Sequence, residues 1–175
     1  LHLRPDLTVL TLRGNVDTRL RKLMDGEFEA IVMATAGLNR LGLSAPKSQV
    51  LGPPLFLPAV GQGALGIEYR EDRQELVEML AFLNHEQTRV CVEAERAFLH
   101  GLEGGCQVPI AGFATFDDGI VNLTGLVADV EGVRRVRVQD TAPADKAADL
   151  GSRLAQEVLG KGGKEILDEV YGSGC

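Results

Sequence analysis

A chain of 175 residues, 45% of them hydrophobic and 25% charged, has room for one large domain or two small ones. Its net charge of −7 argues against a nucleic-acid or anionic-membrane surface, and no apolar run approaches the ~20 residues that span a bilayer. Cysteines 91, 106 and 175 match no zinc spacing and no disulfide framework. We therefore expect a cytoplasmic protein without a metal site.

The first part of the chain alternates strand and helix patterns. Thr8–Leu12 and Phe28–Ala34 are apolar and β-branched, which predicts strands, and the second is apolar enough to be covered on both faces. A helix pattern follows each strand, over Val16–Met24 with Asn15 as N-cap and over Thr35–Leu43. This order predicts an α/β layer with a parallel or mixed sheet, whose ligands bind at the carboxyl ends of the strands.

Arginines lie at or near both of these predicted helices. Residues 1–50 carry seven Lys and Arg against five Asp and Glu, whereas residues 51–175 carry eleven against twenty. Arg13 and Arg19 flank the start of the first helix, where free N–H groups and the helix dipole suit a carboxylate or a phosphate. Arg40 could point the same way from the second helix. The alternative is that all three arginines lie on solvated helix faces.

The middle of the chain is rich in proline and glycine. Residues 44–58 contain four prolines and predict a connector, and residues 58–69 predict a glycine-rich loop that leads into a strand. No Gly-Lys-Ser/Thr follows, so the loop is not a phosphate-binding P-loop. Either its backbone and Gln62 contact a ligand, or the loop is a hinge between domains, and the two interpretations are compatible.

The last part predicts a small α+β domain. Helix patterns cover Glu71–Asn84 and His85–Leu102, with Cys91 beside the apolar stripe of the second. Three strands follow at hairpin spacing, and two further helix patterns end the chain. The strands are predicted over Val108–Phe116, Ile120–Asp129 and Val133–Asp140, and the helices over Ala144–Leu159 and Lys164–Tyr171.

Cys106 lies in a loop between the helix and the first of these strands. Two glycines precede it and Val108-Pro109 follows it, so the chain can turn sharply and the thiol can be reached. Most free cysteines are instead buried and behave as small hydrophobic residues. The position of Cys106 alone does not decide between a reactive thiol and a thiol packed under a turn.

Several stretches together resemble one family. They are Leu12–Leu20 (LRGNVDTRL), Ala36–Gly42 (AGLNRLG), Leu57–Ala64 (LPAVGQGA), Glu93–Phe98 (EAERAF) and Leu102–Cys106 (LEGGC). In this order they are similar to the porphobilinogen deaminase (hydroxymethylbilane synthase) family, and the similarity runs from about residue 5 to residue 172.

The resemblance implies a protein of three domains. The first two are similar to periplasmic binding proteins, and the third is the small α+β domain with its three-stranded antiparallel sheet. On this basis residues 1–58 are the C-terminal part of domain 2, residues 59–84 are a hinge and a segment that returns to domain 1, and residues 85–175 carry the cofactor cysteine.

The resemblance also implies a transferase of tetrapyrrole and heme biosynthesis. It condenses four porphobilinogen units in turn, with loss of ammonia, onto a dipyrromethane that a thioether joins to Cys106, and it releases hydroxymethylbilane by hydrolysis. The implied cofactor-binding residues are Cys106, Gly105, Arg13, Arg19 and Asn15, and the implied substrate-binding residues are Arg40, Gln62 and Gly63. Each pyrrole carries two carboxylates, which arginine binds better than lysine does.

The family's catalytic aspartate is expected before Leu1, and the chain starts there without Met. The sequence therefore predicts a C-terminal fragment that is inactive alone and whose partner is the N-terminal half of the same enzyme, with the full-length form a monomer. One alternative is a non-catalytic carboxylate-binding module of periplasmic-binding-like fold, which leaves the Cys106 loop unused. A thiol hydrolase or acyltransferase needs a base beside Cys106, and only His100 is near in sequence, within the preceding helix.

Overall fold

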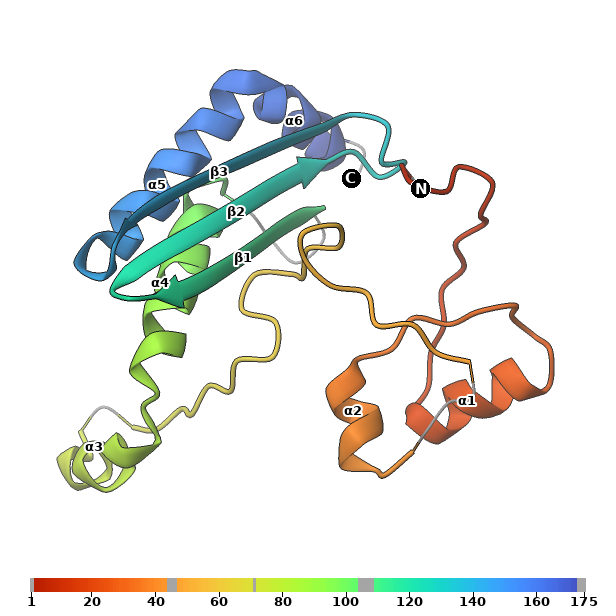
Figure 1. Cartoon of the computed structure of the whole chain (residues 1–175), viewed down its shortest axis with the longest axis horizontal. Coiled ribbons are helices and arrows are strands. Elements are labelled where there is room, and N and C mark those ends of the chain that lie inside the picture. The colour runs from red at the N-terminus through yellow and green to blue at the C-terminus, as the bar shows by residue number, and fades with distance from the viewer. Residues whose placement is uncertain (1, 44–46, 71, 104–108, 173–175) are drawn as a thin grey trace. The chain divides into compact units, whose positions relative to one another are not determined.

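The computed structural model describes residues 2–43, 47–70, 72–103 and 109–172. They divide into two compact units, one of residues 4–51 and one of residues 52–175 with the first three residues (Figure 1). No helix within the described residues is long and apolar enough to cross a membrane.

The first unit contains two short helices, α1 (Val16–Met24) and α2 (Thr35–Arg40). Asn15 caps α1 as predicted, since its Oδ1 accepts a hydrogen bond from the Thr18 N–H at 2.9 Å. A methyl group at Gly37 would lie 3.8 Å from Cγ2 of Val16. The first turns of the two helices therefore lie side by side.

The prediction of two strands in this unit, Thr8–Leu12 and Phe28–Ala34, is wrong for the structure of this chain. Residues 7–13 and 30–34 run as irregular chain, and the sheet formed by the described residues includes neither segment. Val9 and Val32 are 75% and 79% exposed, so the apolar faces that predicted the strands pack against nothing. A strand needs a hydrogen-bonded neighbour as well as an apolar face, and the described residues of this unit, 4–43 and 47–51, provide none. The strand predicted after the glycine-rich loop also does not form.

The second unit has the helix–sheet–helix order that the sequence predicts. Its helices are α3 (Gln74–Leu80), α4 (Glu86–Gly101), α5 (Ala147–Val158) and α6 (Lys164–Gly172), with 3-10 turns at Ala81–Leu83 and Ala144–Lys146. Its strands are β1 (Ile110–Asp117), β2 (Ile120–Ala128) and β3 (Arg135–Pro143). They form one antiparallel sheet in the order β1-β2-β3 (Figure 1).

A two-residue turn joins β1 to β2, with Asp117 paired to Ile120. Asp118 and Gly119 both have positive φ, 45° and 79°. This is the backbone of a type I′ turn, whose twist matches that of the strands, and Asp-Gly is a preferred sequence for it. The hairpin signal in the sequence is confirmed.

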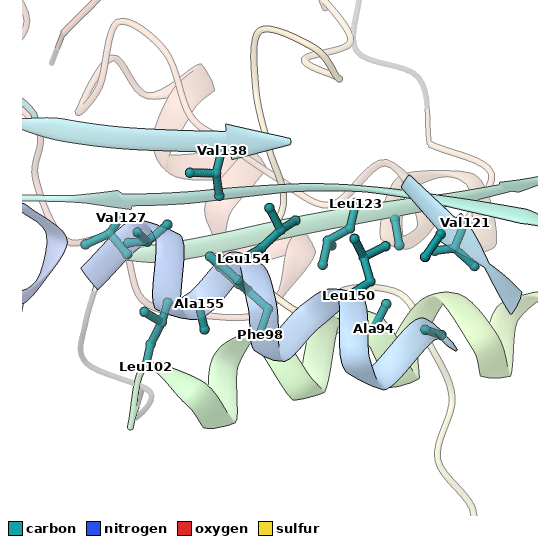
Figure 2. Close-up of a cluster of buried hydrophobic side chains, with 14 of the residues drawn as sticks. Ala94, Phe98, Leu102, Val121, Leu123, Val127, Val138, Leu150, Leu154 and Ala155 are labelled. Carbon is teal, nitrogen blue, oxygen red and sulfur yellow. The ribbon is translucent and has the colours of Figure 1, made fainter. Parts of the chain in front are cut away.

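The core lies between one face of the sheet and the helices α4 and α5 (Figure 2). Val121, Leu123 and Val127 alternate along β2, are fully buried and point to this face. Phe98 of α4 and Leu150 and Leu154 of α5 meet them from the helices. Each large apolar side chain buried in this way contributes about 1.5–3 kcal/mol.

Helices α4 and α5 approach each other at backbone distance. A methyl group at Gly151 would lie 2.2 Å from the carbonyl oxygen of Ala94 and 2.7 Å from the backbone nitrogen of Phe98, and one at Gly101 would lie 2.6 Å from Cβ of Ala155. The crossing therefore requires glycine at these positions. On the sheet, a methyl group at Gly125 would lie 2.3 Å from the Phe98 ring, so the ring fills the space above that glycine.

The connector covers the opposite face of the sheet. The carbonyl oxygen of Pro54 accepts a hydrogen bond from Nη1 of Arg137 on β3 at 2.8 Å. The carbonyl oxygen of Pro58 accepts one from the N–H of Gly112 on β1 at 3.2 Å. Residues 53–58 thus cross from β3 to the outer edge of β1, while α4 and α5 cover the other face.

We predict that Gly151→Ala lowers the free energy of unfolding by about 1–3 kcal/mol, because the added methyl group forces α5 away from the backbone of α4. The control is Gly160→Ala, since no atom lies within 4 Å of a methyl group there. Urea unfolding measures both variants. Equal stability of the two would mean that the helices do not meet at this distance.

Candidate functional site

A cavity of about 510 Å³ lies between the glycine-rich loop, the first half of α4 and strand β1. Gln62 and Gly63 line it from the loop, Thr88, Cys91 and Glu95 from α4, and Thr115 from β1. Apolar side chains such as Val92 and Phe113 share the wall with these polar groups, around a space large enough for a small ligand. The predicted substrate residues Gln62 and Gly63 both belong to this cavity.

Glu95 connects the three parts of the cavity wall. Its side chain is buried, with 6% exposed. Oε1 accepts a hydrogen bond from the N–H of Ala114 on β1 at 2.8 Å, and Oε2 accepts one from the N–H of Gly61 in the loop at 2.7 Å. Hydrogen bonds to an ionised acceptor are shorter and stronger than neutral ones. The carboxylate thus bridges two segments that are far from it in sequence.

Burial affects two titratable groups of the cavity. It raises the pKa of the Glu95 carboxyl, and the hydrogen bonds from Gly61 and Ala114 partly oppose that rise. Burial also raises the pKa of the Cys91 thiol, and the nearby charge of Glu95 adds to the effect. Cys91 packs against the core, as predicted, and its thiol stays protonated at neutral pH.

Two of the three histidines lie on α4 or at its start, within the part of the chain that the structure describes. His85 caps α4, since its Nδ1 accepts a hydrogen bond from the Thr88 N–H at 3.3 Å and lies 2.8 Å from the Thr88 hydroxyl. His100 is exposed on α4. These positions favour a capping residue and a surface residue over a catalytic pair with a cysteine.

Cys106 and Gly105 lie outside the described residues, but both flanks of their segment are anchored. The carbonyl oxygen of Glu103 accepts a hydrogen bond from the Tyr171 hydroxyl at 2.7 Å. On the other side, the carbonyl oxygen of Pro109 accepts one from the Ala128 N–H at 3.1 Å. Helix α6 and strand β2 therefore hold the residues on the two sides of the segment.

The predicted cationic residues Arg13, Arg19 and Arg40 lie in the first unit. Arg19 reaches back over the start of α1, where its Nε donates to the carbonyl oxygen of Gly14 at 2.8 Å. Arg13 precedes α1 and Arg40 ends α2, and both are exposed. The ion pairs found between described residues include none of the three. Asn15 uses its Oδ1 as the cap of α1, which leaves its NH2 group for a ligand.

No role is predicted for Glu95 from the sequence, although this residue lies inside the motif Glu93–Phe98. A signal for it exists. Glu95 follows Cys91 by four residues and precedes Phe98 by three, so the helical period places a carboxylate on the buried face of α4. A charged residue at such a position is rarely fully buried unless it is paired.

Two family models match the chain in order. One, described as porphobilinogen deaminase, dipyromethane cofactor binding domain, matches residues 1–78. The other, described as porphobilinogen deaminase, C-terminal domain, matches residues 89–160, which include α4, the sheet and α5. The matches and the fold define part of a protein that binds a dipyromethane cofactor and carries a separate C-terminal domain.

Curated relatives carry the same description. A porphobilinogen deaminase of Nitratidesulfovibrio vulgaris strain DP4 is 66% identical over 177 residues, which cover 100% of this chain and 56% of the relative. Those of Maridesulfovibrio salexigens and Lawsonia intracellularis are 60% and 51% identical, with 98% of this chain and 56% of each relative covered. The chain belongs to the porphobilinogen deaminase family, and it spans about half the length of these relatives.

We predict that the stability difference between the wild type and Glu95→Gln depends on pH. Because the folded-state pKa of Glu95 is raised, its contribution is fully present below the ordinary pKa of 4.5 and is lost as pH rises through the raised value. Urea unfolding between about pH 4 and about pH 7 should show the wild type losing stability relative to the variant.

Other carboxyls, such as Asp129 and Glu169 with their lowered pKa values, titrate in both proteins. Their contributions to the free energy of unfolding therefore cancel in the difference between wild type and variant. The glutamine leaves one N–H without an acceptor, which adds an offset that does not vary with pH. A difference that stays constant over the range would contradict the raised pKa.

Proposed function

We propose that this chain is the carboxylate-binding and cofactor-anchoring part of a porphobilinogen deaminase, which condenses porphobilinogen units with loss of ammonia. The observation that carries the proposal is the pair of matches to the two family models in chain order. The exposed cations Arg13 and Arg40 in one unit, and in the other a cavity lined by Gln62 and Gly63, support it. The cysteine usage and the acidic net charge fit a reaction in the cytoplasm.

The residues of the chain fit a dipyrromethane joined to Cys106. When bound, this group supplies the attached pyrrole pair from which the product chain is extended. Its carboxylates need fixed cations, and Arg13 and Arg19 provide guanidinium donors near the free N–H groups of α1. The raised pKa of the Cys91 thiol makes Cys91 a poor competitor as the anchor.

The substrate brings further carboxylates, and Arg40 is the cation that we assign to them. Gln62 adds an amide that can donate to a carboxylate or accept from a pyrrole N–H, and Gly63 allows close approach to the backbone. We assign proton transfer to the part of the enzyme that the relatives have and this chain does not match.

We also propose the domain organisation implied by the family. Residues 1–58 would belong to a periplasmic-binding-like α/β domain, residues 59–84 to a hinge and a returning segment, and residues 85–175 to the α+β domain. The exposed apolar segments around Val9 and Val32 suit strands whose neighbours come from the rest of the enzyme. The chain alone would then turn over no porphobilinogen.

We predict a dipyrromethane-sized mass increase on Cys106 when the chain is co-expressed with the remaining segment of the N. vulgaris relative. Intact-mass measurement and peptide mapping locate the adduct. Cys106→Ser should abolish it, and Cys91→Ser is the control that should retain it. An adduct on Cys91 or Cys175 would overturn the assignment of the anchor, and a carboxylate-binding module would carry no adduct at all.

We predict that Arg40→Gln raises the KM for porphobilinogen about tenfold in that assembly, because one charged hydrogen bond to a substrate carboxylate is lost. Arg21→Gln is the matched control, since Arg21 is exposed in the same unit and the charge change is equal. Steady-state kinetics measures both. Equal KM values for the two variants would remove Arg40 from the site.

A further inference from the structure

Glu95 is a buried charge that the proposed chemistry does not use. Moving a carboxylate out of water costs several kcal/mol unless hydrogen bonds compensate, so a buried Glu is retained where it bridges specific partners. Both oxygens of Glu95 are engaged, one with β1 and one with the loop. An apolar side chain could fill the same volume, but it could not hold two backbone N–H groups.

The loop around Gln62 also has hydrogen bonds of its own, and Val60 packs next to Gly112 of β1. Within the loop, Gln62 N–H donates to Ala59 and Ala64 N–H donates to Gly61, at 3.0 and 3.1 Å. Gly61 and Gly63, on either side of Gln62, have φ of +69° and +85°. These local bonds shape the loop, but they do not fix it to the domain.

Two hydrogen bonds fix the loop to the α+β domain. One runs from Gly112 to the Pro58 carbonyl oxygen at 3.2 Å, and the other from Gly61 to Glu95 at 2.7 Å. The second is the shorter and lies next to Gln62. The position of Glu95 on α4 thus sets where the Gln62 amide stands in the cavity.

We propose that Glu95 is a positioning residue: by accepting the Gly61 N–H it holds the loop 58–64 so that Gln62 presents its amide to the substrate. This inference rests on the proposed function for its substrate. The loop contact itself is independent of that function. Glu95 also lines the cavity, and the role proposed for it is to fix the position of Gln62.

Amide hydrogen exchange on the chain tests the contact. In Glu95→Gln, the buried Ala114 N–H retains the side-chain oxygen, and the Gly61 N–H then faces an NH2 group. We expect the Gly61 amide to exchange at least about tenfold faster than in the wild type. The control is Glu93→Gln on the same helix, whose carboxylate is exposed and pairs with Arg89 at 2.9 Å. Unchanged exchange at Gly61 would overturn the proposal.

Kinetics in the co-expressed assembly tests the positioning role. We expect Glu95→Gln and Gln62→Ala each to raise the KM for porphobilinogen about five- to tenfold with little change in kcat, and the double variant to be no worse than either. Additive effects, or a KM equal to that of Glu93→Gln, would show that Glu95 does not act through Gln62.

The two proposals fail in different ways. If the wild-type assembly shows no turnover and no adduct on Cys106, the proposed function fails, and the exchange rate of Gly61 alone decides whether Glu95 holds the loop. If Glu95→Gln does not fold, Glu95→Asp replaces it. This variant keeps the charge but is one methylene shorter, so it should also release Gly61, and protection equal to the wild type would contradict the proposal.

Discussion

The second unit depends on the backbone-distance contact between α4 and α5. Gly151 lets the backbone of α5 lie against that of α4 at Ala94, and this fixes the position of α4 over the sheet. Phe98 then fills the space above Gly125, and the other buried side chains pack around that ring. Interiors are close-packed, so a shift of this helix would be felt throughout the core.

The same helix positions the candidate site. Phe98 faces the core, Glu95 lines the cavity between α4, β1 and the loop, and Cys91 contacts both. Because packing fixes the position of α4, the Glu95 carboxylate on this helix can hold the glycine-rich loop through Gly61. Fold and site are therefore connected by one rigid element, as a precise site requires.

The features that could be predicted from the sequence are those that neighbouring residues determine. Asn15 capping α1 and the Asp118-Gly119 turn are signals within four residues of chain, and both are confirmed. The strands around Val9 and Val32 were predicted wrongly, because a strand also needs a neighbour that local pattern does not supply. The role of Glu95 was missed for a similar reason, since the Gly61 that it binds lies 34 residues away.

The connector and Glu95 also occupy hydrogen-bonding groups on the outer edge of β1. The outward N–H groups of Gly112 and Ala114 on β1 are occupied by the Pro58 carbonyl and by Glu95. An edge strand with unoccupied groups is a template on which a second chain can add a strand. Pro58 and Glu95 therefore protect this edge of β1 against intermolecular sheet growth, and a truncated chain that began at α4 would leave the Gly112 N–H free to pair with another chain.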